Sequence, residues 1–245
     1  SGMLMSNLLP NLANVADDLC LLQAMTTDNK AHAPATLQFH TGTLAEARPS
    51  MGAWISYGLG TENDNLPSFI TIHPPNDVRT YGSSFLPGAH QGTPLTVPKE
   101  EGSLPIKFLR DKNTPESAQR LRLNFLQRMN QRLLDALKTD AQMESIIQSF
   151  ELAFRMQTAT PKLVDLSDES SETLQLYGVN EKATDQNGRA CLLARRLSEA
   201  GVRFVQVTMS GWDHHGNIRE ALPNSCASAD RPISALIGDL RRRPV

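Results

Sequence analysis

The chain has 245 residues, of which 40% are hydrophobic and 20% are charged. This length and apolar fraction suit a folded protein with a sizeable core and exclude a disordered chain. The 24 basic and 26 acidic residues give a formal net charge of −2, which argues against a strongly basic nucleic-acid-binding protein. No apolar run approaches the roughly 20 residues of a membrane-spanning helix, so we expect a soluble protein. Three scattered cysteines are too few for a disulfide framework.

The first elements along the chain alternate between helix and strand patterns. Residues 7–18 have the spacing of a helix, and the apolar run 19–25 is typical of a buried strand. A second helix is expected between Pro49 and Gly60, since proline favours the first helical turn and glycine follows the last. Residues 66–72 then predict a second strand.

The middle of the chain has a different character. Residues 81–105 are rich in glycine and proline and lack periodicity, which indicates an irregular surface segment. Two long helical patterns follow, over residues 115–137 and 141–156. We interpret the stretch at about 106–160 as a helical insertion in a single domain that covers residues 1–245.

The last third returns to alternation. Residues 187–200 form an amphipathic pattern that ends at Gly201, and residues 202–209 are the clearest strand of the sequence. A loop over residues 210–217 leads towards a final helix, which we expect Asp230 to open with Pro232 near its start. The order of elements predicts an α/β fold, with a mixed or mostly parallel sheet flanked by helices.

Histidines follow each of the three predicted strands. They are His32, His73 and the pair within Asp213-His214-His215. Because ligands of open α/β sheets bind at the carboxyl ends of the strands, these side chains could converge. One carboxylate and imidazole groups suit a divalent transition ion, with zinc preferred and manganese as the alternative.

The spacing within this loop favours one pair of metal ligands. Neighbouring side chains of an extended loop point in opposite directions, whereas Asp213 and His215, two positions apart, can bind one ion together. His214 would then face a second metal ion or the substrate, and His32 is a further candidate ligand. The alternative is structural: Asp213 would cap a turn, and the histidines would bond backbone carbonyl groups.

Candidates for a protein nucleophile have weaker support. Thr26 and Thr27 are nominated because they follow a predicted strand, and no Gly-x-Ser-x-Gly motif is present. The sequence also lacks a Gly-rich dinucleotide fingerprint after a strand and a Walker loop. These absences argue against a nicotinamide-dependent enzyme and a nucleotide kinase. His90 lies in the glycine-rich stretch, where we expect it to be exposed to solvent.

Several motifs resemble the domain-of-unknown-function 1501 family, and the likeness extends from near the N-terminus to Leu240. The segments that carry it are Ala31-His32-Ala33-Pro34-Ala35, His40-Thr41-Gly42, Arg48-Pro49-Ser50-Met51-Gly52-Ala53-Trp54-Ile55-Ser56-Tyr57-Gly58-Leu59-Gly60, Glu151-Leu152-Ala153-Phe154-Arg155-Met156-Gln157, Arg195-Arg196-Leu197, Gly201-Val202-Arg203-Phe204-Val205-Gln206 and Trp212-Asp213-His214-His215-Gly216-Asn217.

This family is similar to sulfatases and to the alkaline phosphatase superfamily, so the resemblance implies a partial alkaline-phosphatase-like core. Asp213 and His215 match the Trp-Asp-x-His-Gly loop of the family, which resembles an Asp/His metal-ligand pair. His32 matches a histidine in the loop where the superfamily often keeps its nucleophile. The first strand of the family and its C-terminal Gly-Glu-Phe-Gly-Arg and Asp-His motifs are not found, which predicts an internal fragment.

From these observations we expect a metal-dependent hydrolase of phosphoesters (diesters, triesters or monoesters) or of sulfate esters. Asp213 and His214 would take part in catalysis with a metal-activated water, and Thr26 or Thr27 would serve any covalent step. The partners would be a small-molecule ester and a second copy of the chain, with no nucleic acid or membrane. The alternative is a non-catalytic, oligomerising fragment with a vestigial metal loop. Family members are often exported, but this sequence shows no signal and leaves the location unknown.

Overall fold

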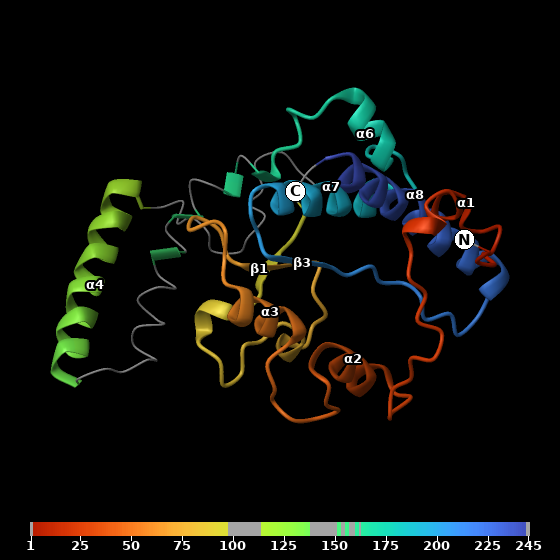
Figure 1. The fold of residues 1–245 in the computed structure, drawn as a ribbon. Helices are drawn as coiled ribbons and strands as arrows, with labels where there is room; N and C mark the ends of the chain where they lie inside the picture. Colours follow the sequence, from red (N-terminus) through yellow and green to blue (C-terminus); the bar gives the residue numbers. More distant parts are fainter. Residues whose placement is uncertain are drawn as a thin grey trace. The chain divides into compact units, whose positions relative to one another are not determined.

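The structure is a computed structural model, and its ribbon is drawn in Figure 1. The chain divides into two compact units. The first unit contains Ser1–Thr26, Asp165–Glu199 and Val207–Val245. The second unit contains Thr27–Val164 and Ala200–Gln206. The residues that the structure describes are 2–97, 114–137, 151–152, 155–156, 160–161 and 163–243.

A three-stranded parallel sheet forms the centre of the second unit. Its strands are β1 (Phe69–Ile72), β2 (Thr93–Leu95) and β3 (Phe204–Val207), in the order β2-β1-β3. All four residues of β1 are buried, as expected for a central strand that is covered on both faces. Ile70 pairs with Thr93 and Ile72 with Leu95. The sheet and its flanking helices confirm the α/β class, with all strands parallel.

Helix α3 (Met51–Leu59) packs closely on this sheet. The Ser50 hydroxyl accepts a hydrogen bond from the backbone N–H of Ala53 at the start of the helix, and Gly60 ends it with a positive φ. Gly52 lies against the sheet, because a Cβ atom there would come within 2.6 Å of the Phe69 ring. The predicted helix between Pro49 and Gly60 is therefore confirmed, and its glycine sets the distance to the sheet.

The other described elements of the second unit are helical. They are α2 (His32–Thr41), η2 (Val78–Thr80), η3 (Gly88–His90) and α4 (Glu116–Leu137). Helix α4 agrees with the pattern over residues 115–137. Most of the second expected helix, residues 141–156, lies outside the described residues.

The first unit is built from helices. Its elements are α1 (Pro10–Ala13), η1 (Ala16–Asp18), α6 (Ser171–Tyr177), α7 (Asp185–Glu199) and α8 (Ile218–Arg242). Helix α8 packs against α7, α6 and α1. Tyr177, Cys191, Leu192 and Ala235 form a buried cluster between these helices. Burial raises the pKa of the Cys191 thiol to about 12, so this cysteine is a core residue and not a reactive thiolate.

A buried arginine holds charged groups together inside the first unit. Arg195 on α7 is only 2% exposed, and its guanidinium contacts Glu169 at 2.5 Å and Glu199 at 3.4 Å. The carboxylate of Asp239 lies 3.6 Å away and also accepts a hydrogen bond from the Tyr177 hydroxyl. Such a network is costly to break, because each partner would remain as an uncompensated charge in a buried site.

Helix α8 contradicts the expected start of the final helix. It begins at Ile218 instead of near Asp230, and it contains both Pro223 and Pro232. Proline cannot donate to the carbonyl four residues earlier, which for Pro232 is that of Ser228. The side-chain amide of Asn187 donates to this carbonyl instead, at 3.0 Å. The helix therefore continues through Pro232 because α7 supplies the missing donor.

Three other local expectations differ from the structure. The run 19–25 is not a strand; it is irregular, and Leu21, Leu22 and Met25 are exposed. The expected helix over residues 7–18 is divided into α1 and η1. Strand β2 lies within the stretch that we expected to be irregular, and it contains Pro94, which an edge strand tolerates.

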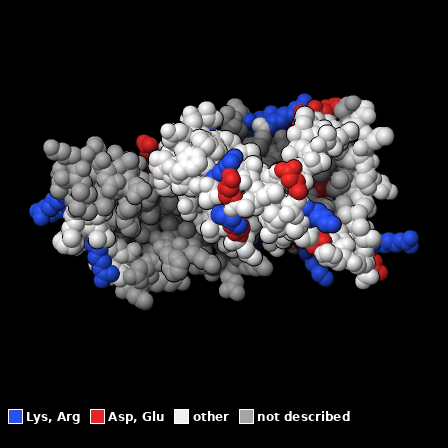
Figure 2. Space-filling view, turned by 90° about the horizontal axis from the view of Figure 1, so that it is seen from below, with Lys and Arg blue, Asp and Glu red and all other residues white. Residues whose placement is uncertain are grey.

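Among the described residues, no helix is long and apolar enough to cross a membrane. The face shown in Figure 2 carries basic and acidic side chains close to one another on its described part. This interspersed arrangement agrees with the nearly balanced composition of the chain.

Candidate metal centre

The loop that follows β3 carries the candidate ligands and belongs to the first unit. It runs from Ser210 to Asn217, where α8 begins. Gly211 and Asn217 have φ angles of +93° and +50°, so the backbone turns sharply near both ends of the loop. Glycine and asparagine tolerate this left-handed region better than other residues.

Asp213 and His215 lie side by side within this loop. The Oδ2 atom of Asp213 is 2.8 Å from Nε2 of His215. Both side chains face solvent, with exposed fractions of 48% and 85%. The structure thus brings together the two residues for which the sequence favours a shared ion.

His214 lies apart from this pair, against helix α8. Its Nε2 atom is 3.3 Å from the hydroxyl of Ser225, and that hydroxyl donates to the carbonyl of Gly211 at 2.9 Å. Because the serine proton points to Gly211, the serine oxygen is an acceptor for an N–H at Nε2 of His214. We assign neutral His214 this tautomer from the hydrogen-bond network, which leaves Nδ1 as an acceptor.

The donor set of Asp213 and His215 fits a divalent transition ion. Zinc binds imidazole nitrogen and carboxylate oxygen at about 2.0–2.2 Å, which separates neighbouring tetrahedral ligands by about 3.4 Å. The separation of 2.8 Å between Oδ2 and Nε2 is about 0.6 Å shorter than that, so a small opening of the pair would admit an ion. A protein zinc site needs at least one further ligand.

His32 is the first residue of α2 in the second unit, and its side chain is exposed. It does not follow a strand, because residues 19–25 are irregular, so the reason for expecting it at a sheet edge is wrong. Its match to the family motif is independent of that reason, and His32 remains a ligand candidate on the sequence alone.

The reason for nominating the two threonines as nucleophiles is wrong on the same ground. Thr26 and Thr27 lie on an exposed irregular segment, and the Thr27 hydroxyl donates to the backbone carbonyl of Asn29 at 2.9 Å. Among the described residues, no strand precedes them. Nothing in this geometry activates either hydroxyl as a nucleophile.

The second unit holds a histidine network that the sequence did not indicate. The Ser56 hydroxyl is 2.8 Å from Nδ1 of His90 and also contacts the hydroxyl of Ser68. Burial lowers the pKa of His90, which favours the neutral ring. His90 is therefore partly buried and held in place, not freely exposed as expected. Ser56 could have indicated this network in the sequence, since it is a polar residue on the same face of α3 as Gly52 and Ala53, and that face is buried.

The family comparison covers the whole chain. The model of the family described as "Protein of unknown function (DUF1501)" matches residues 1–245. The chain belongs to the DUF1501 family. No protein of curated function and no solved structure matches it. This DUF1501 protein thus carries its Asp213–His215 pair inside the matched region, in a family whose description leaves the function open.

Proposed function

We propose that this DUF1501 protein is a divalent-metal-dependent hydrolase of phosphoesters or sulfate esters. The observation that carries the proposal is the pairing of Asp213 and His215 at 2.8 Å on an exposed loop after a strand. Loops at the carboxyl ends of parallel strands are where open α/β proteins bind their ligands. The resemblance to sulfatases and to the alkaline phosphatase superfamily supports the same class of reaction, with zinc or manganese as the ion.

Each residue of the loop has a distinct role in this proposal. Asp213 and His215 hold the ion, and the sequence nominates His32 or His214 as the further ligand. A bound divalent ion would lower the pKa of a water molecule and polarise the ester group. If His32 is the further ligand, His214 is free to contact the substrate, and Ser225 fixes the orientation of its ring.

The exposure of the pair agrees with a small-molecule ester as substrate. An Asp–His contact that only stabilised the loop would add little to its stability at this exposure, since even charged surface pairs contribute about 0–1 kcal/mol. Ser225 and the turn at Gly211 nevertheless hold the loop on α8. A loop that is held in a fixed orientation can position ligands for a metal ion, whereas a loop with a purely structural role would not need this orientation.

The test is hydrolysis of p-nitrophenyl phosphate, bis(p-nitrophenyl) phosphate and p-nitrophenyl sulfate by the full chain. We expect turnover that EDTA abolishes and that zinc or manganese restores. Asp213→Asn and His215→Ala should each lower kcat/KM at least hundredfold. Asp168→Asn, which removes another exposed carboxylate of the first unit, should leave it unchanged.

The variants His32→Ala and His214→Ala separate the two candidates for the further ligand. Loss of metal-restored activity identifies the ligand, whereas a change in KM alone indicates a substrate contact. Absence of any metal-dependent hydrolysis would contradict the proposal and favour the alternative, a non-catalytic chain with a vestigial metal loop.

A further inference from the structure

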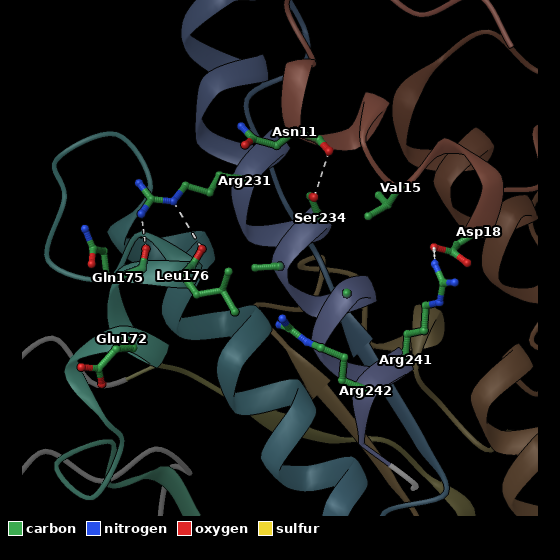
Figure 3. A pocket seen from close by; sticks show the side chains of 12 residues that line it. Asn11, Val15, Asp18, Glu172, Gln175, Leu176, Arg231, Ser234, Arg241 and Arg242 are labelled. Carbon is green, nitrogen blue, oxygen red and sulfur yellow. Dashed lines mark hydrogen bonds and ion pairs between the residues drawn. The ribbon is translucent and has the colours of Figure 1, made fainter. Parts of the chain in front are cut away.

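A pocket of about 710 Å³ opens in the first unit, between α8, α6 and the N-terminal α1–η1 segment (Figure 3). This volume lies in the range of sites for small organic ligands. None of the lining residues belongs to the loop 210–217, so the pocket is separate from the candidate metal centre.

Some of the residues that line the pocket are apolar. Val15, Leu176 and Ala235 contribute aliphatic side chains, and Gly238 adds none. A Cβ atom built at Gly238 would meet no atom within 4 Å, so the space beside it is open and not filled by a neighbour. An apolar group of a ligand can occupy this space without displacing any side chain.

Three arginines also line the pocket, and two of them are already engaged. Arg231 contacts Glu181 at 2.8 Å and donates to the carbonyl groups of Gln175 and Leu176 at the end of α6. Arg241 pairs with Asp18 at 3.1 Å, as the dashed line in Figure 3 shows. Both therefore tie the walls of the pocket together.

Arg242 differs from these two arginines. In the described part of the chain, its ion pair is with Asp239, at a distance of 4.0 Å, which is too long for a hydrogen bond. The Asp239 carboxylate is already shared, since Arg243 contacts it at 3.0 Å and Arg195 at 3.6 Å. One carboxylate thus faces three guanidinium groups. The guanidinium of Arg242 is left with donors available for a ligand.

We propose that this pocket binds a small organic anion, with Arg242 binding a phosphate or carboxylate group and the apolar wall binding the remainder. The planar guanidinium matches both anions, because it can donate two parallel hydrogen bonds. Arg242 is 66% exposed and lines the pocket, so an anion can reach it without rearrangement of the fold. A purely structural role, stabilisation of the C-terminal end of α8, would need no pocket beside it.

The test is isothermal titration calorimetry of the full chain with phenyl phosphate, benzoate, inorganic phosphate and benzyl alcohol. It is performed on the Asp213→Asn/His215→Ala double variant in EDTA, so that binding at the candidate metal centre does not contribute. This background also separates failure of this proposal from failure of the proposed hydrolase. We expect phenyl phosphate or benzoate to bind at least tenfold more tightly than inorganic phosphate, and benzyl alcohol not to bind.

Two variants and one control assign the binding to the pocket. Arg242→Ala should weaken binding at least tenfold. Gly238→Leu, whose Cβ atom meets nothing within 4 Å and whose side chain would occupy the open space beside it, should weaken binding similarly. Arg219→Ala, which removes an exposed arginine of the same helix outside the pocket, should leave it unchanged. Circular dichroism confirms that each variant is folded. Failure of both aromatic anions to bind, or equal affinity in the double-variant background with and without Arg242→Ala, would overturn the proposal.

Discussion

The carboxylate of Asp230, in the middle of α8, binds the start of helix α1 at Asn11, a residue 219 positions earlier in the chain. Its two oxygens accept hydrogen bonds from the backbone N–H groups of Asn11 and Leu12, at 2.9 and 2.8 Å, and from the Asn11 side-chain amide. Leu9, the residue before the first residue of α1, has no side chain that could cap this helix. A distant aspartate therefore satisfies the free donors of a four-residue helix.

Replacing Asp230 should release the N-terminal segment. Asp230→Ala removes the acceptor for three buried or partly buried donors, and we expect it to lower the free energy of unfolding by about 2 kcal/mol. Urea denaturation monitored by circular dichroism measures this loss. The matched change Asp168→Ala, at an exposed site, should stay within about 0.5 kcal/mol of wild type. Equal midpoints for both variants would contradict the capping role.

The contact between α3 and the sheet predicts opposite effects at two glycines of one helix. Gly52→Ala would place a methyl group within 2.6–2.7 Å of the Phe69 and Phe204 rings, so we expect a loss of about 1–3 kcal/mol in unfolding free energy. Gly58→Ala meets nothing within 4 Å and should stabilise the helix by up to about 1 kcal/mol. Chemical denaturation of both variants measures these changes. A Gly52→Ala protein as stable as wild type would show that the close packing of α3 on the sheet is not required.

These examples show why the sequence predicted some elements and not others. Helices α3, α4 and α7 and strands β1 and β3 were predictable because their caps and periodicity are local. The position of Asp230 was misread as a helix start, since its partners lie 219 residues away. The continuation of α8 through Pro232 depends on Asn187, another distant residue. Local patterns carry no information about such partners.

The candidate site could likewise be predicted from the sequence only in part. The pairing of Asp213 with His215 follows from their spacing of two, which is a local property. The contact between His214 and Ser225 needed the position of α8. The expectation for Thr26 and Thr27 failed because the apolar run before them does not become a strand, although its composition suits one.

The buried Arg195 network should be sensitive to removal of its cation. Arg195→Met leaves Glu169 with Arg196 alone and takes a cation from Asp239, so we expect a loss of about 3–5 kcal/mol in unfolding free energy. Arg219→Met, at an exposed site, serves as the control and should change little. Guanidinium chloride would screen these charges, so urea is the appropriate denaturant. A loss below about 1 kcal/mol for Arg195→Met would contradict the buried-network account.

Two histidines predict a dependence of stability on pH. Burial lowers the pKa of both His40 and His90 below the ordinary value of 6.5. The unfolded chain therefore binds protons at these sites before the folded chain does. The part of the unfolding free energy that depends on these two histidines should be fully present above about pH 6.5. It should decrease as the pH drops below this value. Urea midpoints at pH 7.5 and 5.5 measure this change.

The variants His40→Gln and His90→Asn test the origin of that dependence. Asparagine at position 90 can still hydrogen-bond to Ser56 but does not titrate in this range. The double variant should show a smaller decrease between pH 7.5 and 5.5 than wild type. An unchanged decrease would assign the pH dependence to other groups.

The most direct test of the account is zinc binding by the full chain after removal of metal with EDTA, measured by equilibrium dialysis and elemental analysis. If Asp213 and His215 hold an ion, wild type and the Asp168→Asn control should retain close to one zinc ion per chain. Asp213→Asn and His215→Ala should bind at least tenfold more weakly. If wild type retains no zinc, or if the His215→Ala chain retains as much zinc as wild type, the candidate metal centre would be contradicted.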